Sequence, residues 1–232
     1  MSSEVKNQVN RQDNAWRGEP LPRGRHKLAT EVVRASQRER LIRAMLETVA
    51  ESGYEATTVP QVVARARVSR NAFYEFFADK TDCFIAACDE EVTDELLGAL
   101  LAFAAEPDWV QMMRRGVGAY LQWWAGRPAL SRAYFIGLPA AGERAIAQRE
   151  RAYARFRRLF MAAGQRARSE QPGLAPLDQF IPRLLVLAIT ELVAQEVRAG
   201  RTEQLPELED RLAFTAIKLL ADDETAERAL AI

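Results

Sequence analysis

Between Thr57 and Phe84 the sequence predicts two short helices joined by a tight turn, followed by the start of a third helix. Thr58 and Ser69 are hydroxyl residues that can each cap a helix N-terminus by accepting a hydrogen bond from a free backbone N–H group. Apolar residues recur at helical spacing behind each cap, so each helix has one face suited to burial. These faces comprise Val59, Val62, Val63 and Ala66 in the first helix and Ala72, Phe73, Phe76 and Phe77 in the second.

The opposite face of the second helix carries Arg70, Asn71, Tyr74 and Glu75. These residue types hydrogen-bond to base edges and phosphates. Two capped helices on either side of a short turn form the helix-turn-helix unit, whose second helix enters the major groove of DNA. The candidates for base contacts are Arg70, which suits guanine, and Asn71, which suits adenine. For Glu75 two roles remain open: accepting from cytosine, or preventing mispairing.

The charge of the chain restricts how it can bind DNA. Its 232 residues include 32 basic and 32 acidic ones, so the formal net charge is zero, and any DNA site must be a local patch. The strongest local bias lies between Arg23 and Arg43, where seven basic residues accompany two acidic ones. We interpret Arg23 and Arg25 as part of an arm that follows phosphates or enters a minor groove, the alternative being a solvated tail.

The remaining sequence predicts an all-α fold, because it shows helical periodicity with no alternating strand pattern and no internal repeat. A helix over about 35–52, which Gly53 is placed to end, completes a three-helix N-terminal domain. We expect a flexible basic arm at 1–29, the helix-turn-helix domain at 30–84, and a larger helical domain at 85–232. Further helices are expected over about 81–105, 108–126, 128–137, 140–167, 178–199 and 206–221.

The expected helix over 81–105 connects the two domains. Its middle is acidic, and acidic residues keep a surface away from DNA, so the domain boundary is placed inside this helix. The acidic residues are Asp89, Glu90, Glu91, Asp94 and Glu95.

Aromatic and methionine side chains gather in the middle of the larger domain. Pockets for small molecules are mostly apolar with a few placed polar groups, so this set suits a moderately large hydrophobic ligand. The alternative is that the same side chains form an ordinary core. Since Trp123 and Trp124 are adjacent, they cannot share one helix face. The candidate pocket residues are Met113, Tyr120, Trp124, Tyr134, Phe135, Phe156 and Phe160.

The segment from Arg183 to Gln195 is apolar on more than one face, and such a helix must be buried on all sides. We expect one face to pack on its own domain and another on a second copy of the chain. A purely intrachain core is the alternative. The candidate interface residues are Leu184, Leu185, Ile189 and Leu192 in this helix and Leu208, Leu212, Ala216 and Leu219 in the last one.

The region 37–86 resembles the TetR family of transcriptional regulators. The matching residues are Gly53, Tyr54, Thr57, Thr58, Val59, Val62, Val63, Ala66, Val68, Ser69, Phe73, Tyr74, Phe77, Lys80 and Phe84. The resemblance implies an all-helical homodimer with a variable ligand-binding domain, and phosphate contacts from Thr58, Tyr74 and Lys80. It also implies repression at a palindromic DNA site that a ligand relieves.

Three positions depart from the family pattern. Arg67 stands where the turn glycine is usual, and a non-glycine residue in a left-handed backbone costs about 1 kcal/mol. Phe76 replaces a frequent histidine, and Ala72 replaces a common threonine, serine or glycine. These changes affect the placement of the second helix and leave its exposed side chains intact.

Other functional classes find little support. The only histidine, His26, lies in the expected arm, and no Gly-rich phosphate loop or metal-spaced cluster occurs, so we expect no catalytic residue, metal or cofactor. Cys83 and Cys88 fit no metal or redox spacing and are expected to be buried and reduced.

No signal peptide or membrane-spanning run is present, so a cytoplasmic location and no membrane partner are expected. The expected partners are double-stranded DNA, a second copy of the chain and a hydrophobic effector. The alternative is a regulator without an effector, either architectural or paired with another protein. A larger domain with no apolar cavity would favour that alternative.

Overall fold

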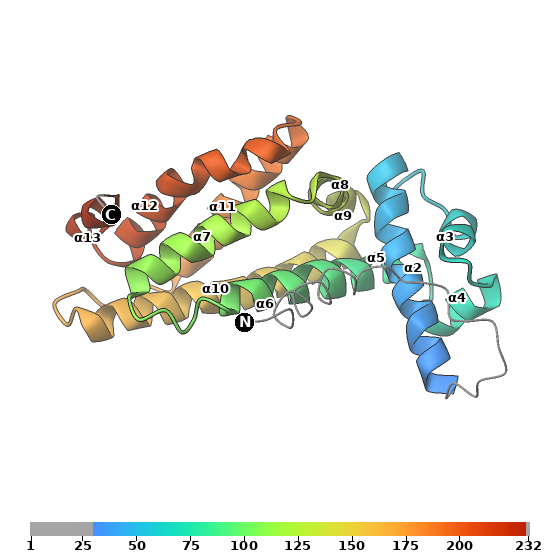
Figure 1. The fold of residues 1–232 in the computed structure, drawn as a ribbon, viewed down its shortest axis with the longest axis horizontal. Helices are drawn as coiled ribbons and strands as arrows, with labels where there is room; N and C mark the ends of the chain where they lie inside the picture. The colour runs from blue at the N-terminus through green and yellow to red at the C-terminus, as the bar shows by residue number, and fades with distance from the viewer. Residues whose placement is uncertain (1–29, 231–232) are drawn as a thin grey trace, which may run out of the picture.

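The computed structural model describes residues 30–230, and every regular element in this range is a helix, which confirms the all-α prediction (Figure 1). The N-terminal helices are α2 (Thr30–Ser52), α3 (Val59–Ala66) and α4 (Arg70–Phe76). The connecting segment contains α5 (Lys80–Cys88), the π-helical turn η1 (Asp89–Asp94) and α6 (Glu95–Leu101). The larger bundle contains α7 (Trp109–Ala125), α8 (Pro128–Arg132), the π-helical turn η2 (Ala133–Gly137), α9 (Leu138–Ala140), α10 (Glu143–Glu170), α11 (Phe180–Arg198), the 3-10 helix η3 (Thr202–Leu208), α12 (Glu209–Leu220) and α13 (Asp223–Leu230).

The helices form two groups that the connecting segment joins (Figure 1). Helices α2, α3 and α4 make a small group at one end of the molecule, while α7, α10, α11 and α12 extend away from it. Leu41 and Met45 of α2 and Phe73 of α4 are fully buried, so one shared core stabilises the small group. Trp109 and Trp124 of α7 are almost fully buried in the larger bundle.

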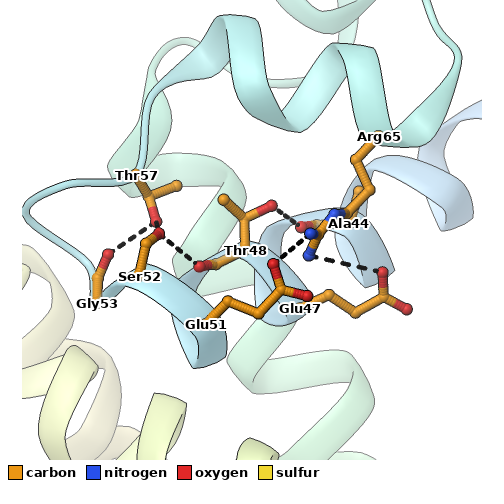
Figure 2. Close-up of polar contacts among 8 residues, drawn as sticks. All are labelled: Ala44, Glu47, Thr48, Glu51, Ser52, Gly53, Thr57 and Arg65. Atoms are coloured by element: carbon orange, nitrogen blue, oxygen red, sulfur yellow. Dashed lines mark hydrogen bonds and ion pairs between the residues drawn. The ribbon is translucent and has the colours of Figure 1, made fainter.

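Polar contacts fasten the end of α2 to the segment that enters α3 (Figure 2). The Thr57 hydroxyl donates to the carbonyl oxygen of Gly53 at 2.8 Å and lies 3.4 Å from the Ser52 hydroxyl. Arg65 of α3 forms an ion pair with Glu51 of α2. Because buried Thr57 has its hydroxyl paired, the turn before α3 is held without an unsatisfied polar group.

The turn between α3 and α4 contains a left-handed residue. Arg67 has φ 53° and ψ 46°, and its N–H donates to the carbonyl oxygen of Ala64 at 3.2 Å. Arg40 of α2 donates to the carbonyl oxygen of Ala66 at 3.1 Å, which fixes the same turn from the other side. A tertiary hydrogen bond thus supports a conformation that glycine would adopt without steric strain.

Several helix boundaries differ from the sequence predictions. Helix α2 begins at Thr30 instead of about residue 35, and Glu31 lies favourably in its first turn. The connecting helix, expected to be continuous to 105, is interrupted by η1 and ends at Leu101. Helix α13 was not expected; the carboxylate of Asp222 begins it by accepting from the N–H of Thr225 at 2.8 Å.

Both cysteines are free and buried, as expected, and burial raises the pKa of each thiol. Along residues 30–230, no helix is both long enough and apolar enough to cross a membrane.

The larger bundle packs on the small group through η2. A methyl group at Gly137 would lie 2.9 Å from Cγ1 of Val49 in α2 and 3.3 Å from the ring of Phe84 in α5. The side chain of Val49 cannot move easily, because a β-branched residue in a helix has one strongly preferred rotamer. Glycine is therefore needed here for close approach.

Replacing Arg67 with glycine should stabilise the protein by about 0.5–1 kcal/mol. The substitution removes the strain of the left-handed backbone, and this gain exceeds the cost of the greater conformational freedom of the unfolded chain. Denaturant unfolding of Arg67→Gly measures the change. Ala64→Gly, at an exposed site inside α3, is the control and should destabilise by up to about 1 kcal/mol. An equal loss of unfolding free energy in both variants would contradict this prediction.

Gly137→Ala should destabilise the protein by about 1–3 kcal/mol, since the added methyl group overpacks the contact with Val49. Gly98→Ala is the matched control, because no atom lies within 4 Å of a methyl group built there. This control should stabilise α6 by about 0.5–1 kcal/mol. The prediction fails if the melting temperatures of the two variants rise together.

Candidate DNA-binding surface and ligand cavity

Helix α4 is positioned by its cap and by one buried aromatic residue. The Ser69 hydroxyl accepts from the N–H of Ala72 at 3.1 Å, so Ser69 caps the helix as the sequence predicts. Phe73 is fully buried, and its ring centroid lies 5.6 Å from that of Phe77. Burial of this face leaves the opposite face of α4 in solvent.

The exposed face of α4 carries the four residues that the sequence placed there, namely Arg70, Asn71, Tyr74 and Glu75. The guanidinium of Arg70 lies 5.8 Å from the centre of the Tyr74 ring and forms no ion pair with another residue in the described range 30–230. Glu75 is paired with Arg34 of α2 at 2.8 Å. Arg70, Asn71 and Tyr74, which is 48% exposed, are thus the groups on this face that are open to DNA, and Arg70 and Asn71 remain the candidates for base edges.

The two other candidate phosphate contacts already have partners. The backbone N–H and the hydroxyl of Thr58 each donate to Oε1 of Gln61 at 2.8 Å. The ammonium of Lys80 donates to the carbonyl oxygen of Tyr54 at 2.8 Å and lies 4.2 Å from the centre of the Tyr54 ring. Lys80 therefore fixes the loop before α3, and phosphate contact by Lys80 and Thr58 stays a prediction. Arg23 and Arg25 lie outside the described residues.

A cavity of about 270 Å³ lies between the connecting segment, α7, α10 and α11. Six of the seven candidate pocket residues line it: Met113, Tyr120, Trp124, Tyr134, Phe156 and Phe160. The seventh, Phe135, does not; its ring packs 4.6 Å from that of Trp124 in the core. Its η2 neighbour Tyr134 reaches the cavity, because adjacent helical residues point in different directions.

The cavity also has lining residues that the sequence did not single out. Leu100 and Leu101 come from the end of α6, and Phe103 comes from the segment after it; Leu101 is 54% exposed and marks the open end. Ile189 and Thr190 come from α11. Ile189 was assigned to a dimer interface because its helix is apolar all round, and that pattern does not show which face is turned inward.

The cavity is elongated along the helices. Its lining runs along α7 from Met112 to Trp124 and along α10 from Tyr153 to Arg166. At the helical rise per residue, each of these stretches spans about 18–20 Å. The shape therefore suits a linear, largely apolar ligand more than a compact one.

The few polar groups of the cavity lie at its two ends. Near the open end, Arg166 donates to the carbonyl oxygen of Pro107 and to Oε1 of Glu170. At the inner end are Tyr120 and Thr190. Burial raises the pKa of the Tyr120 phenol, while the nearby Thr190 hydroxyl and the Trp124 indole act in the opposite direction.

The π-helical turn η1 joins the cavity to the DNA-binding bundle. Val92 lines the cavity, whereas Glu90 forms an ion pair with Arg38 of α2 through two hydrogen bonds. On the other side of the turn, Asp89 and Asp94 both pair with Arg155 of α10. One short segment thus contacts the cavity, α2 and α10.

A second set of ion pairs connects α10 with the start of α5. Arg144 of α10 pairs with Asp79 at 2.7 Å and with Asp82 at 3.3 Å. Asp79 also caps α5 by accepting from the N–H of Asp82 at 2.7 Å. Burial tends to raise the pKa of Asp79, but its hydrogen bonds from the Asp82 N–H and Arg144 outweigh burial and lower it.

Half of the candidate interface residues are already buried in the single chain. Their side chains are buried within this one chain, so they face its own core: Leu185, Ile189, Leu212 and Ala216. Leu208 and Leu219 are partly buried, whereas Leu184 and Leu192 are exposed. The exposed apolar face of α11 comprises Phe180, Leu184, Leu187 and Leu192, of which Phe180 and Leu187 were not predicted.

Residues 41–87 match the family described as bacterial regulatory proteins of the tetR family. A curated relative, the HTH-type transcriptional activator FasR of Mycolicibacterium smegmatis, is 28% identical over 104 residues. The match covers 45% of this chain and 48% of FasR, so the chain spans about half the length of this relative.

Two solved structures share the fold over most of the chain. The fatty acid degradation regulator FadR of Bacillus halodurans superposes with a TM-score of 0.69, at 16% identity, over 79% of this chain and 94% of that one. FadR of Bacillus subtilis, solved in complex with stearoyl-CoA, gives a TM-score of 0.68, at 16% identity, over 80% of this chain and 98% of that one.

The matched region contains the whole helix-turn-helix with its capped, outward-facing α4, and the same fold continues through the larger bundle. These relatives are regulators of transcription, which agrees with the prediction that the chain is not an enzyme. The helix-turn-helix region at 41–87 is that of the tetR family of bacterial regulatory proteins, and the larger bundle shares its fold with the two FadR structures.

Proposed function

We propose that this regulator binds a palindromic DNA site as a homodimer and is released from it by a linear hydrophobic effector. The observation that carries the proposal is the elongated apolar cavity whose wall includes η1 and η2, the two turns that also contact α2. A regulator without an effector would need no such cavity. We retain the domain assignment of 30–84 for DNA binding and 85–232 for effector binding and dimerisation.

The homodimer is expected to form through the exposed face of α11. Leu184, Leu187 and Leu192 are between 37% and 43% exposed, and they follow one side of the helix. A contiguous apolar surface of this kind marks a protein interface. Two copies joined in this way would carry two α4 helices, which must match half-sites about 34–36 Å apart.

The shape of the cavity and the ligand of the Bacillus subtilis FadR point to the same effector class. That protein holds stearoyl-CoA, a thioester with a long alkyl chain. The cavity of this chain, lined by Leu96, Leu100 and Phe156 among others, offers an apolar path of the corresponding shape. A long-chain acyl compound is therefore the effector class that we propose.

The effector would act on the separation of the two α4 helices. A chain that fills the cavity beside Val92 would shift η1, which pairs with Arg38 of α2 and Arg155 of α10. The ion pair between Arg144 and Asp79 would pass the same movement to the start of α5, just behind α4. The effector changes DNA affinity only as far as it binds one of the two arrangements more tightly. The FasR relative is an activator, so the direction of control is the first property to test.

Arg70→Ala and Asn71→Ala should each weaken binding to the specific site by roughly 5- to 100-fold, since a base contact provides about 1–3 kcal/mol of discrimination. Mobility shifts on DNA flanking the gene, compared with a random duplex over a salt series, measure the loss. Arg157→Ala, at an exposed position of α10, is the control and should bind as wild type does. If wild type prefers neither duplex, the proposed DNA reading is wrong.

Gly116→Leu should fill the cavity and abolish the response to stearoyl-CoA while preserving DNA binding. Gly116 lines the cavity, and a methyl group built there meets no atom within 4 Å. Gly98→Leu, in α6 but outside the cavity lining, is the matched control. Release of DNA by stearoyl-CoA from wild type and Gly98→Leu, but not from Gly116→Leu, is the expected result. A response retained by Gly116→Leu would place the effector elsewhere.

A further inference from the structure

The inner end of the cavity contains a buried donor without a partner. Trp124 is 1% exposed, and its indole Nε1–H makes no hydrogen bond with any described residue. The ring lines the cavity, and its centroid lies 6.3 Å from that of Tyr120. Leaving a buried donor unpaired costs about 1–3 kcal/mol, so a ligand that supplies an acceptor gains from this position.

Hydroxyl groups surround this donor. Tyr120, Tyr134, Tyr153 and Thr190 all line the same part of the cavity. The Tyr120 and Tyr134 ring centroids lie 6.3 Å and 5.1 Å from that of Trp124, so their side chains are neighbours of the indole. A hydroxyl group can donate or accept, so this cluster can satisfy both oxygens of a bound head group.

A positive charge lies behind the cluster. The guanidinium of Arg149 lies 5.6 Å from the centre of the Tyr153 ring, and its Nε is buried without a hydrogen bond to any residue in 30–230. Burial raises the pKa of both Tyr134 and Tyr153, and the charge of Arg149 acts in the opposite direction on each. An anionic or strongly polar acceptor is therefore favoured at this end over an alkyl group.

We propose that the inner end of the cavity is a head-group pocket that binds the carboxyl group of a free long-chain fatty acid, inserted head first. The indole N–H of Trp124 donates to one carboxyl oxygen, and the hydroxyls of Tyr153 and Thr190 contact the other. The alkyl chain then runs between α7 and α10 to the open end near Leu101. This inference rests on the proposed function, since it identifies the chemistry of the same effector cavity.

The alternative orientation leaves the cluster unsatisfied. A CoA thioester must keep its nucleotide outside, so its carbonyl stays near the open end and only its terminal methyl group reaches Trp124. About 18 Å separates the two ends along α7, so the thioester carbonyl cannot reach the inner donors. A free carboxylic acid has no bulky group and can enter by its polar end.

The test compares tetradecanoic acid with tetradecanoyl-CoA by titration calorimetry on the full-length protein. Trp124→Phe removes the N–H, and Tyr153→Phe removes only a hydroxyl. Each should weaken acid binding by roughly tenfold, the effect of losing a hydrogen bond to a buried group. Trp123→Phe is the matched control, because its indole N–H is likewise buried and unpartnered but the residue does not line the cavity. It should leave acid affinity unchanged, and no variant should weaken thioester binding selectively.

The outcomes separate this inference from the proposed function. If the acid binds both Trp124→Phe and Tyr153→Phe as tightly as wild type, the head-group pocket is overturned. If only the thioester binds and releases DNA in a parallel mobility shift, the head-group pocket is overturned while the proposed effector class stands. If neither compound binds or releases DNA, both proposals fail. Should Trp124→Phe misfold, the affinity of the nearly isosteric Tyr153→Phe for the acid is sufficient to decide whether the pocket exists.

Discussion

The rest of the structure depends on the packing of Phe84, a residue of α5 that contacts both bundles. Its fully buried ring lies 5.1 Å from that of Tyr54, beside the turn into α3, and also packs against Gly137 of η2. The DNA-binding bundle and the larger bundle therefore share one side chain in their cores. A well-packed core resists small continuous deformation, so movement on one side of Phe84 must be accommodated on the other.

Both π-helical turns lie where the cavity meets the DNA-binding bundle. Such turns are rare and occur often at functional sites, because the wider turn interrupts the regular hydrogen-bond ladder. In η1 the irregularity lets Val92 face the cavity while Glu90 reaches Arg38 of α2. In η2 it sets Tyr134 against the cavity and brings Gly137 against α2. The irregular backbone thus occurs at the two places where a signal could cross.

Local sequence signals were sufficient to predict the small bundle. The features that the sequence did not predict are those that long-range packing determines. The cap at Ser69 follows from residue type and spacing, and the left-handed turn at Arg67 follows from the resemblance to the TetR pattern. The sequence has no comparable pattern for a π-helical turn, so an uninterrupted connecting helix was expected. An all-apolar helix such as α11 does not reveal its inner face, which is why Ile189 was assigned to an interface although it lines the cavity. The cavity aromatics could be predicted because they are concentrated in the middle of the larger domain.

The structure also changes the electrostatic picture of DNA binding. The structure describes part of the basic segment from Arg23 to Arg43, and two of its arginines form ion pairs within the chain. Arg34 pairs with Glu75, and Arg38 pairs with Glu90. Exposed pairs like these contribute little to stability, but they do remove charge from the surface facing DNA. With a net charge of zero, affinity must then come from few groups. Arg70 has no acidic partner in the described range. On α4 it is therefore the residue that we expect both to contact bases and to attract the phosphates.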